Sequence, residues 1–381
     1  MDKHLFTVER LETFVESVLT GLGVSSDHAR ICSQRMIEAD LRGMHGHGIF
    51  RLPPYCQRIG AGGYNLRPDI KVKRETPVSA IVDGDNGLGQ VVVTQAVELS
   101  IKKAKASGMA WVGICNSNHA GAAGVYAALA LPHDLIAMYM AIGNANHMPP
   151  WGGIDLLLST NPIAFAIPTG QEPPIVLDMA TTTASYGKVK VAAQKGEELP
   201  VGWMVDQKGQ ALTDPQRIKD GFLLPIGEHK GYGLNFVIGA LAGVLNTAAF
   251  GSAVIDFNKD FITPTNSGQL IFTMRPDLFR DMAEFKTEMD MRIQEIRNST
   301  PMEGADPIRL PGEMALERQR QMRADGVPVA RPVLLQLREI AHRLDLPDRL
   351  DEGRRFSMLQ ANLFNQSQTQ CCRCSCAPMR K

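Results

Sequence analysis

The chain has 381 residues and a formal net charge of zero, from 40 basic and 40 acidic side chains. This length suggests two domains or one large one, and it is ample to bury a core. No long basic block appears, so nucleic acid is not expected as a partner. No run of about 18 apolar residues is uninterrupted, and the first residues lack the apolar core of a secretory signal, so we expect neither a membrane span nor secretion.

The seven cysteines fall into two groups. Cys32, Cys56 and Cys115 are scattered without metal-like spacing, so we interpret them as reduced thiols of a cytoplasmic protein. The other four cluster near the C-terminus, at Cys371, Cys372, Cys374 and Cys376. Their spacing fits no tetrahedral zinc motif, and we interpret residues 357–381 as a disordered or aberrant tail in preference to a metal or lipidation site.

The first 75 residues are predicted to form a helical segment. Apolar side chains recur at helical spacing over residues 7–22, and a second helix is predicted over 27–42, with Ser25 in position to cap it. A short helix over 51–58 would carry Pro53 in its first turn, where proline is tolerated.

Between the second and third of these helices lies a run rich in glycine, histidine and arginine, from Asp40 to Leu52. His47 titrates near neutrality and can exchange a proton during a reaction. Arg51 offers a fork of donors that suits a substrate carboxylate. Taken alone, the run favours a different interpretation, a glycine-capped helix end where histidine and arginine complement the helix dipole.

Strands and helices alternate in the next part of the chain. Strands are predicted over 77–84, 109–115 and 135–142, and helices over 90–106 and 125–131 lie between them. Such alternation predicts an α/β protein with a largely parallel or mixed sheet covered by helices. Ligands of these sheets bind beyond the carboxyl ends of the strands.

Two candidate residues follow predicted strands. His119 lies in the turn directly after the strand over 109–115, where a functional role is favoured over a place on the surface. Asp178 lies towards the end of another predicted strand, over 174–183, which finishes with three hydroxyl side chains. A carboxylate there can orient a histidine or bind a ribose, or it can cap the following helix, and the local sequence does not decide between these alternatives.

A glycine-rich segment leads into an apolar helix predicted over 234–245. Lys230 and Gly231 lie in this approach, where backbone N–H groups and the positive end of the helix dipole suit a phosphate or pyrophosphate. The alternative is a helix start packed closely on the sheet. Neither G-x-G-x-x-G nor G-x-x-x-x-G-K-[ST] occurs, which excludes the ordinary Rossmann fingerprint, and the absence of G-x-S-x-G argues against an α/β-hydrolase.

The last part of the chain is predicted to add one strand, over 266–272, and three helices, over 278–298, 312–325 and 331–344. We therefore divide the chain into three parts. They are a helical N-terminal segment (1–75), an α/β domain for cofactor and substrate (76–275), and a helical C-terminal segment (276–350) that packs with the first.

Six motifs occur in a fixed order: Gly46-His47-Gly48 with Arg51, His119-Ala120-Gly121, Thr160-Asn161-Pro162, Asp178-Met179-Ala180-Thr181, His229-Lys230-Gly231-Tyr232-Gly233 and Pro311-Gly312-Glu313. Together they resemble the malate/L-lactate dehydrogenase family that is distinct from the ordinary Rossmann lactate dehydrogenases. That family includes ureidoglycolate and sulfolactate dehydrogenases and piperideine-2-carboxylate reductases. The resemblance extends from about residue 5 to residue 345.

This resemblance implies an NAD- or NADP-dependent oxidoreductase with its own α/β dinucleotide-binding fold, usually a homodimer. His119 matches the histidine that accepts the substrate's hydroxyl proton, and Arg51 matches the carboxylate-binding arginine. The Ser-His-Asp relay of imine-reducing members would fall on position 46, His47 and Asp178. Position 46 is Gly46 here, where the family usually has serine, and this argues against the imine-reducing reaction.

Other positions match segments of the family that contact the cofactor. Asn144 lies in one of them, and we assign it to the substrate side of the site. The expected cofactor contacts are Asp178, Met179, Ala180, Lys230 and Gly231.

The expected activity is reversible hydride transfer between C2 of a small 2-hydroxy acid, similar to malate or lactate, and C4 of a nicotinamide in NAD or, alternatively, NADP. The expected catalytic residues are His119, His47 and Asp178, without a metal ion. Two alternatives remain. One is an NADPH-dependent reductase of a cyclic imine carboxylate on the same fold, and the other is a nucleotide-binding protein without catalysis.

Overall fold

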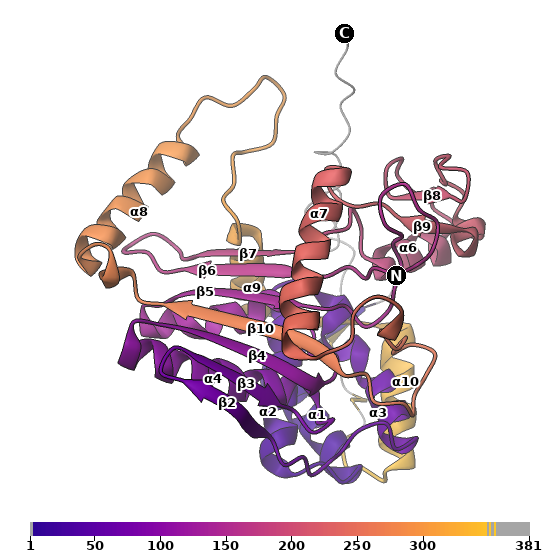
Figure 1. The fold of residues 1–381 in the computed structure, drawn as a ribbon. Helices are drawn as coiled ribbons and strands as arrows, with labels where there is room; N and C mark the ends of the chain where they lie inside the picture. The colour runs from indigo at the N-terminus through magenta and orange to yellow at the C-terminus, as the bar shows by residue number, and fades with distance from the viewer. Residues whose placement is uncertain (1–2, 349, 352–353, 356–381) are drawn as a thin grey trace.

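The computed structural model describes residues 3–348, 350–351 and 354–355. The tail over 357–381, with its four cysteines, lies outside these residues. A seven-stranded sheet forms the centre of the structure (Figure 1), in the order β2-β3-β4-β10-β5-β6-β7. The strands are β2 (Lys71–Thr76), β3 (Ser79–Asp83), β4 (Met109–Ser117), β5 (Ile136–Ala141), β6 (Ile163–Ile167), β7 (Ile175–Met179) and β10 (Ser267–Met274).

The sheet is mixed, which confirms the predicted fold class. Among the described neighbours in this sheet, β3 and β4 run parallel and every other pair runs antiparallel. The late strand β10 contributes two of the antiparallel pairs, because it inserts between β4 and β5 and pairs antiparallel with both. The edge strand β2 was not predicted, since all six of its residues are exposed and show no apolar alternation.

Helices cover both faces of the sheet. Side chains that alternate along a strand point to opposite faces, and Leu270 and Ile271 of β10 accordingly belong to different apolar clusters. The cluster of Ile271 includes α4 (Gly89–Ser107) and α5 (Ala123–Ala127). The cluster of Leu270 includes α7 (His229–Ile238) and its π-helical continuation (Gly239–Gly243).

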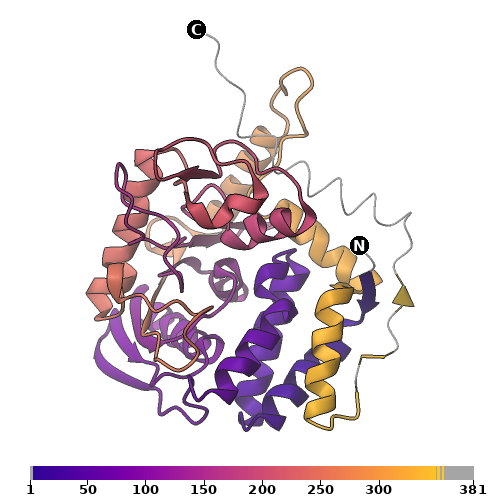
Figure 2. The same cartoon turned by 90° about the vertical axis from the view of Figure 1, so that its right-hand side faces the viewer.

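The two ends of the chain share one helical subdomain. The first strand, β1 (Lys3–Phe6), pairs antiparallel with β11 (Val327–Ala330), and β12 (Arg354–Arg355) pairs with β1 on its other side. Figure 2 shows the C-terminal α10 beside the N-terminal helices. The helices are α1 (Val8–Gly21), α2 (Ser26–Leu41), α3 (Leu52–Gly60) and α10 (Arg331–Arg343). One apolar core joins side chains from all of them.

These helices begin where the sequence supplies caps. Thr7 and Ser25 accept backbone N–H bonds in the first turns of α1 and α2, as residues at the N-cap position commonly do. Pro53 falls in the first turn of α3, where no helical N–H partner is lost.

A small lobe lies beside the main sheet at the upper right of Figure 1. It consists of α6 (Tyr186–Lys195) and a two-stranded sheet of β8 (Met204–Asp206) and β9 (Gly221–Leu223), and it has its own apolar cluster. The sequence showed this region only as polar and turn-rich, because strands of three residues carry too few apolar positions to reveal a period.

Two further helices complete the chain, α8 (Met282–Arg297) and α9 (Glu313–Asp325). Helix α8 lies against the β6–β7 turn, where the Asp290 carboxylate accepts backbone N–H bonds from three successive residues, 170–172. Short 3-10 turns occur at His45–His47, Ile49–Arg51, Ala128–His133, Pro215–Asp220, Val244–Asn246, Gly251–Ala253 and Pro276–Leu278. No helix in the described part of the chain is long and apolar enough to cross a membrane.

Candidate active site

The turn after α2 is held by a buried aspartate. Asp40 is 2% exposed; its Oδ2 accepts the Ile49 backbone N–H at 2.7 Å, and its Oδ1 lies 2.9 Å from Nδ1 of His45. A side chain at Gly48 would place its Cβ 2.1 Å from the same carboxylate, so the turn closes only with glycine there. Asp40, His45 and Gly48 therefore form the scaffold of the turn and leave His47 and Arg51 free for another role.

His47, His119 and Arg51 meet in space. The two imidazole rings stack with their centroids 5.5 Å apart and an interplanar angle of 20°. Burial lowers the pKa of His47 to about 4, with a smaller contribution from Arg51. Burial, Arg51 and His47 together hold the pKa of His119 well below its ordinary value. Both histidines are therefore neutral near pH 7 and able to accept a proton.

Arg51 is fixed by two contacts that leave part of its guanidinium available. Its Nε donates to the Gly46 carbonyl oxygen at 2.9 Å, and one terminal nitrogen donates to Asn258 at 3.3 Å. No acidic side chain pairs with Arg51 among the described residues. A partly exposed guanidinium of this kind can receive a carboxylate.

Tyr55 is a site residue that sequence reasoning missed. Its hydroxyl lies 2.6 Å from Nδ1 of His119 and accepts a hydrogen bond from Nε2 of Gln90 at 2.9 Å. The one signal in the sequence was the spacing of His47, Arg51 and Tyr55 at intervals of four, although these residues do not share one helix, because two 3-10 turns precede the start of α3 at Leu52. Buried tyrosines are common in cores, however, and Gln90 stands in an otherwise apolar helix start without any such signal.

The loop that carries His119 is anchored by its neighbour Asn118. The Asn118 amide donates to three oxygens of residues 86–87, and its own oxygen accepts from Thr265. The Phe257 ring lies 5.6 Å from the His119 ring, centroid to centroid, and the Phe257 N–H donates to the Asn144 carbonyl. Asn144 is thus linked to His119 through Phe257, while its side-chain amide donates to Ser267.

Asp178 lies at the start of the helix that follows His119. Its Oδ2 accepts the Gly124 N–H at 2.6 Å, in the first turn of α5. No hydrogen bond joins this carboxylate to either histidine within the described part of the chain. Burial raises the pKa of Asp178 to about 6, although the Gly124 bond and Arg42 act in the opposite direction. Of the roles open from the sequence, the structure shows a helix cap, but on α5 and not on the helix that follows Asp178 in the chain.

The two segments expected to contact the cofactor lie side by side. The Ile226 N–H donates to the Thr181 carbonyl, and the Asn235 amide in α7 donates to the Thr181 hydroxyl at 2.8 Å. Asn161 of the Thr-Asn-Pro motif donates to Asn235 in turn, at 2.9 Å. This buried network, with its donors and acceptors paired, holds the end of β7 against the N-terminus of α7.

The N-terminus of α7 is suited to a phosphate. The helix begins at His229, five residues before the predicted start, so Lys230 and Gly231 lie in its first turn. No side chain caps this end, and Lys230 is exposed, without an ion pair among the described residues. The open N–H groups, the helix dipole and the ammonium fit the phosphates of a dinucleotide. Met179 and Ala180, both partly exposed, lie at the end of β7 next to it.

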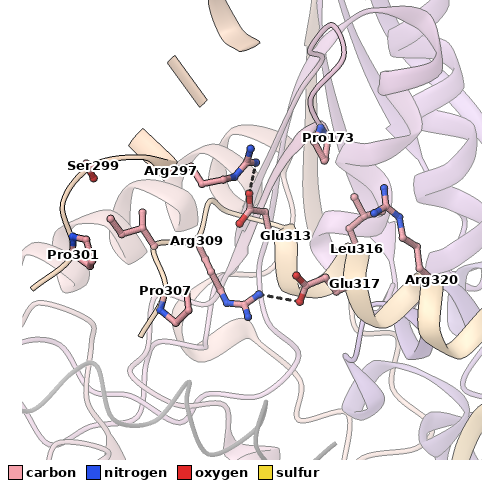
Figure 3. A pocket seen from close by; sticks show the side chains of 11 residues that line it. Pro173, Arg297, Ser299, Pro301, Pro307, Arg309, Glu313, Leu316, Glu317 and Arg320 are labelled. Atoms are coloured by element: carbon pink, nitrogen blue, oxygen red, sulfur yellow. Dashed lines mark hydrogen bonds and ion pairs between the residues drawn. The ribbon is translucent and has the colours of Figure 1, made fainter. Parts of the chain in front are cut away.

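A separate cavity of about 540 Å³ lies at the other end of β7, near Pro173 (Figure 3). Four of its charged side chains pair with each other: Arg297 with Glu313 at 2.7 Å, and Arg309 with Glu317 at 2.9 Å. None of the site residues predicted from the sequence lines this cavity. No cluster of three potential metal ligands occurs among the residues that the structure describes.

Comparison with known proteins places this arrangement in a group of dehydrogenases. The chain is 38% identical to the malate dehydrogenase of Pyrococcus abyssi over 346 residues, covering 88% of this chain and 94% of that protein. It is also 38% identical to the L-sulfolactate dehydrogenase of Methanocaldococcus jannaschii over 341 residues, covering 89% and 96%. The solved structure of the sulfolactate dehydrogenase from that organism superposes with a TM-score of 0.83, at 36% identity, over 90% of this chain and 98% of that chain.

The solved δ1-piperideine-2-carboxylate reductase of Pseudomonas syringae shares the fold, with a TM-score of 0.78 at 29% identity over 88% of this chain and 99% of that chain. The fold is thus shared with solved enzymes of this group. The profile of the malate/L-lactate dehydrogenase family matches residues 6–338, and the chain belongs to that family. The expected resemblance is confirmed.

Proposed function

We propose that this enzyme transfers a hydride reversibly between C2 of a small 2-hydroxy acid and C4 of a nicotinamide, in NAD or NADP. The observation that carries the proposal is the meeting of two neutral histidines and one available arginine. An acid–base group and a carboxylate anchor are what oxidation of a 2-hydroxy acid requires beside the cofactor. The names of the relatives, malate and sulfolactate dehydrogenases, agree with such a substrate.

In this proposal Arg51 holds the substrate carboxylate and so orients C2 towards the cofactor. His119 would take the hydroxyl proton of the substrate when C2 is oxidised to a carbonyl. His47, stacked on His119, positions the substrate oxygen. Proton transfer of this kind contributes about 10²–10⁴-fold to the rate.

The remaining predicted residues shape the cofactor side of the site. Lys230 and the first turn of α7 bind phosphate, and Gly231 lets that turn approach Ile226, whose carbonyl oxygen would lie 1.9 Å from an added Cβ. Asp178 fixes the start of α5, and with Met179 and Ala180 it would contact the cofactor. Asn144 borders the substrate. The cofactor, when bound, supplies the hydride acceptor.

We further propose a homodimer in the cytoplasm. Cys32, Cys56 and Cys115 are buried free thiols, which agrees with a reducing compartment. Helix α7 exposes Phe236 and Val237, each about half accessible, which agrees with an apolar contact between subunits.

The purified chain should oxidise at least one member of a panel of malate, lactate, sulfolactate and ureidoglycolate, assayed with NAD⁺ and with NADP⁺. The competing activity is reduction of piperideine-2-carboxylate with NADH or NADPH, and the reductase of the same fold motivates it. Reduction of the imine without oxidation of any hydroxy acid would replace our proposal by that alternative. Tight cofactor binding without turnover on either panel would indicate a non-catalytic protein.

A further inference from the structure

His119 is the end of a buried chain of hydrogen-bonding groups that reaches away from the substrate site. Cys32 Sγ lies 3.9 Å from Gln90 Oε1, Gln90 Nε2 lies 2.9 Å from the Tyr55 hydroxyl, and that hydroxyl lies 2.6 Å from His119 Nδ1. Cys32, Gln90 and Tyr55 are each 1% exposed, so water does not compete for these contacts. The four residues come from α2, α4, α3 and the loop after β4.

The chemistry of each group decides which partner donates in each of these hydrogen bonds. A protonated thiol carries one hydrogen to donate, and burial raises the pKa of Cys32, which keeps the hydrogen in place. If Cys32 donates to the oxygen of the Gln90 amide, the amide turns its N–H towards Tyr55. Tyr55 then accepts from Gln90, and its own hydrogen has one acceptor left among its described contacts, Nδ1 of His119.

If all the hydrogen bonds run in the reverse direction, the bond at the Cys32 end is weaker. His119 would donate from Nδ1 to Tyr55, Tyr55 would donate to the Gln90 oxygen, and the Gln90 N–H would face the sulfur of Cys32. Sulfur is a weak acceptor, and the thiol hydrogen would lose Gln90, the one acceptor that the described structure gives it. Burial makes such an unmatched end costly.

We propose that Gln90, oriented by Cys32, is a positioning residue that holds His119, through Tyr55, in the tautomer with its hydrogen on Nε2. The free enzyme then presents a donor to the carbonyl oxygen of a 2-oxo acid. Acceptance of a hydroxyl proton at Nε2 requires the other tautomer: the ring must lose the Nε2 hydrogen and take one up at Nδ1, by proton exchange with water, while the Gln90 amide and the Tyr55 hydroxyl turn so that Nδ1 donates to Tyr55. The effect of this tautomer on catalysis rests on the proposed role of His119, whereas the tautomer itself does not depend on any substrate.

The test measures the ¹⁵N chemical shifts of the histidine rings in the full chain labelled with ¹⁵N-histidine, near neutral pH and without substrate. Protonated and unprotonated ring nitrogens differ widely in shift, and the His119 signals are those missing in His119→Asn. We expect Nε2 of His119 to be the protonated nitrogen in the wild-type protein. Protonation at Nδ1 would overturn the inference, whatever substrates the enzyme later proves to use.

Variants of Gln90 test its part. Gln90→Met keeps the length of the side chain but donates no hydrogen bond and accepts only weakly, so His119 should become a mixture of both tautomers. Gln90→Glu offers carboxylate oxygens in place of the N–H, so Tyr55 must donate to it, and the hydrogen of His119 should move to Nδ1. A wild-type pattern in both variants would overturn the role of Gln90.

Cys32 is tested by a matched pair of variants. Cys32→Ser retains a donor and should keep the wild-type tautomer, whereas Cys32→Ala removes the donor and should give the mixture seen for Gln90→Met. An unchanged spectrum for Cys32→Ala would remove Cys32 from the proposal. Because the wild-type spectrum needs no substitution in the core, the inference stays testable even if a variant fails to fold. If the wild-type protein gives the expected spectra but turns over no substrate of the panel, the proposed function is refuted and the tautomer assignment stands.

Discussion

The hydroxyl of Tyr55 lies 2.6 Å from Nδ1 of His119 and ties the proposed acid–base residue to the helical subdomain. Tyr55→Phe removes this contact and leaves the Gln90 N–H without its acceptor. We expect kcat to fall by about 10- to 100-fold, with a smaller change in KM, because the imidazole loses its orientation and the substrate carboxylate keeps its anchor. Steady-state kinetics on the best substrate of the panel measures both.

Tyr64→Phe provides the matched control. Tyr64 is also buried, at 6% exposure, but its hydroxyl has no hydrogen-bond partner among the described residues. The loss of that hydroxyl should leave kcat unchanged within about twofold. An equal fall in both variants would mean that the effect of Tyr55→Phe is general and not due to His119.

His119→Gln should reduce kcat by at least about 10²-fold, since proton transfer then depends on solvent. His47→Gln should cost less, because that ring positions the substrate oxygen without receiving the proton. His342→Gln, an exposed histidine in the last turn of α10, serves as the control. Near-full turnover by a folded His119→Gln protein would remove His119 from the mechanism.

Arg51→Met should raise KM for the acid substrate by at least about tenfold and change kcat less, because it removes a contact made in both the ground state and the transition state. Arg51→Lys should recover only part of the loss, since an ammonium lacks the planar fork that matches a carboxylate. Arg30→Met, on the exposed side of α2, controls for loss of a positive charge. A KM unchanged in Arg51→Met would place the carboxylate elsewhere.

Features of the fold that depend on local sequence patterns could be predicted, whereas features that depend on contacts between distant parts of the chain could not. Helices with a continuous apolar stripe, such as α1, and strands bounded by glycine, such as β4, were predicted within two residues of their observed ends. The insertion of β10 between β4 and β5 was not, because the order of strands depends on pairing across some 150 residues of chain. Local periodicity carries no information about such pairing.

The candidate site likewise could be predicted only as far as local sequence patterns reach. His47, Arg51 and His119 could be chosen from their chemistry and their position in loops, and the structure brings them together. Gln90 could not, since its role comes from contacts with α2 and α3 that no local pattern encodes. For Asp178 the strand end was predicted, whereas its partner, Gly124, lies 54 positions earlier in the chain.

Gly46 and Gly48 offer a paired test of the turn. An added Cβ at Gly46 meets nothing within 4 Å, whereas at Gly48 it would lie 2.1 Å from the Asp40 carboxylate. Gly46→Ser should therefore change the free energy of unfolding by no more than about 0.5 kcal/mol. Gly48→Ser should lose about 1–3 kcal/mol through overpacking. Denaturant unfolding of both variants measures the difference, and equal stability would contradict the described turn.

Gly46→Ser also tests the meaning of the departure from the family pattern. If serine is what imine reduction requires, the variant should gain activity on piperideine-2-carboxylate over the wild-type enzyme, while hydroxy-acid oxidation stays within a few-fold. A gain in neither reaction would show that position 46 does not decide between them.

Asp178→Asn should alter the dependence of stability on pH. The folded-state pKa of Asp178 is raised from 3.8 to about 6, so the native protein retains a proton that the unfolded chain has lost, and this group lowers stability as pH rises through that window. Asparagine has no such loss and still accepts the Gly124 N–H. The variant should therefore gain up to about 3 kcal/mol relative to wild type between pH 4 and pH 7. Thermal unfolding at both pH values, with Asp155→Asn on an exposed loop as control, measures it; a constant difference would contradict the shifted pKa.

The pairing of β1 with β11 has a consequence for the order in which the protein can be completed on the ribosome. Lys3 pairs with Ala330, and the core of the first helices includes Leu334 and Leu337. The helices that carry Arg51 and Tyr55 are thus synthesised first but cannot close their core until nearly all of the matching family region has emerged. The sheet, whose last strand ends at Met274, can assemble earlier. The two halves of the candidate site therefore form at different times, and the half that contains Arg51 and Tyr55 is the last to form.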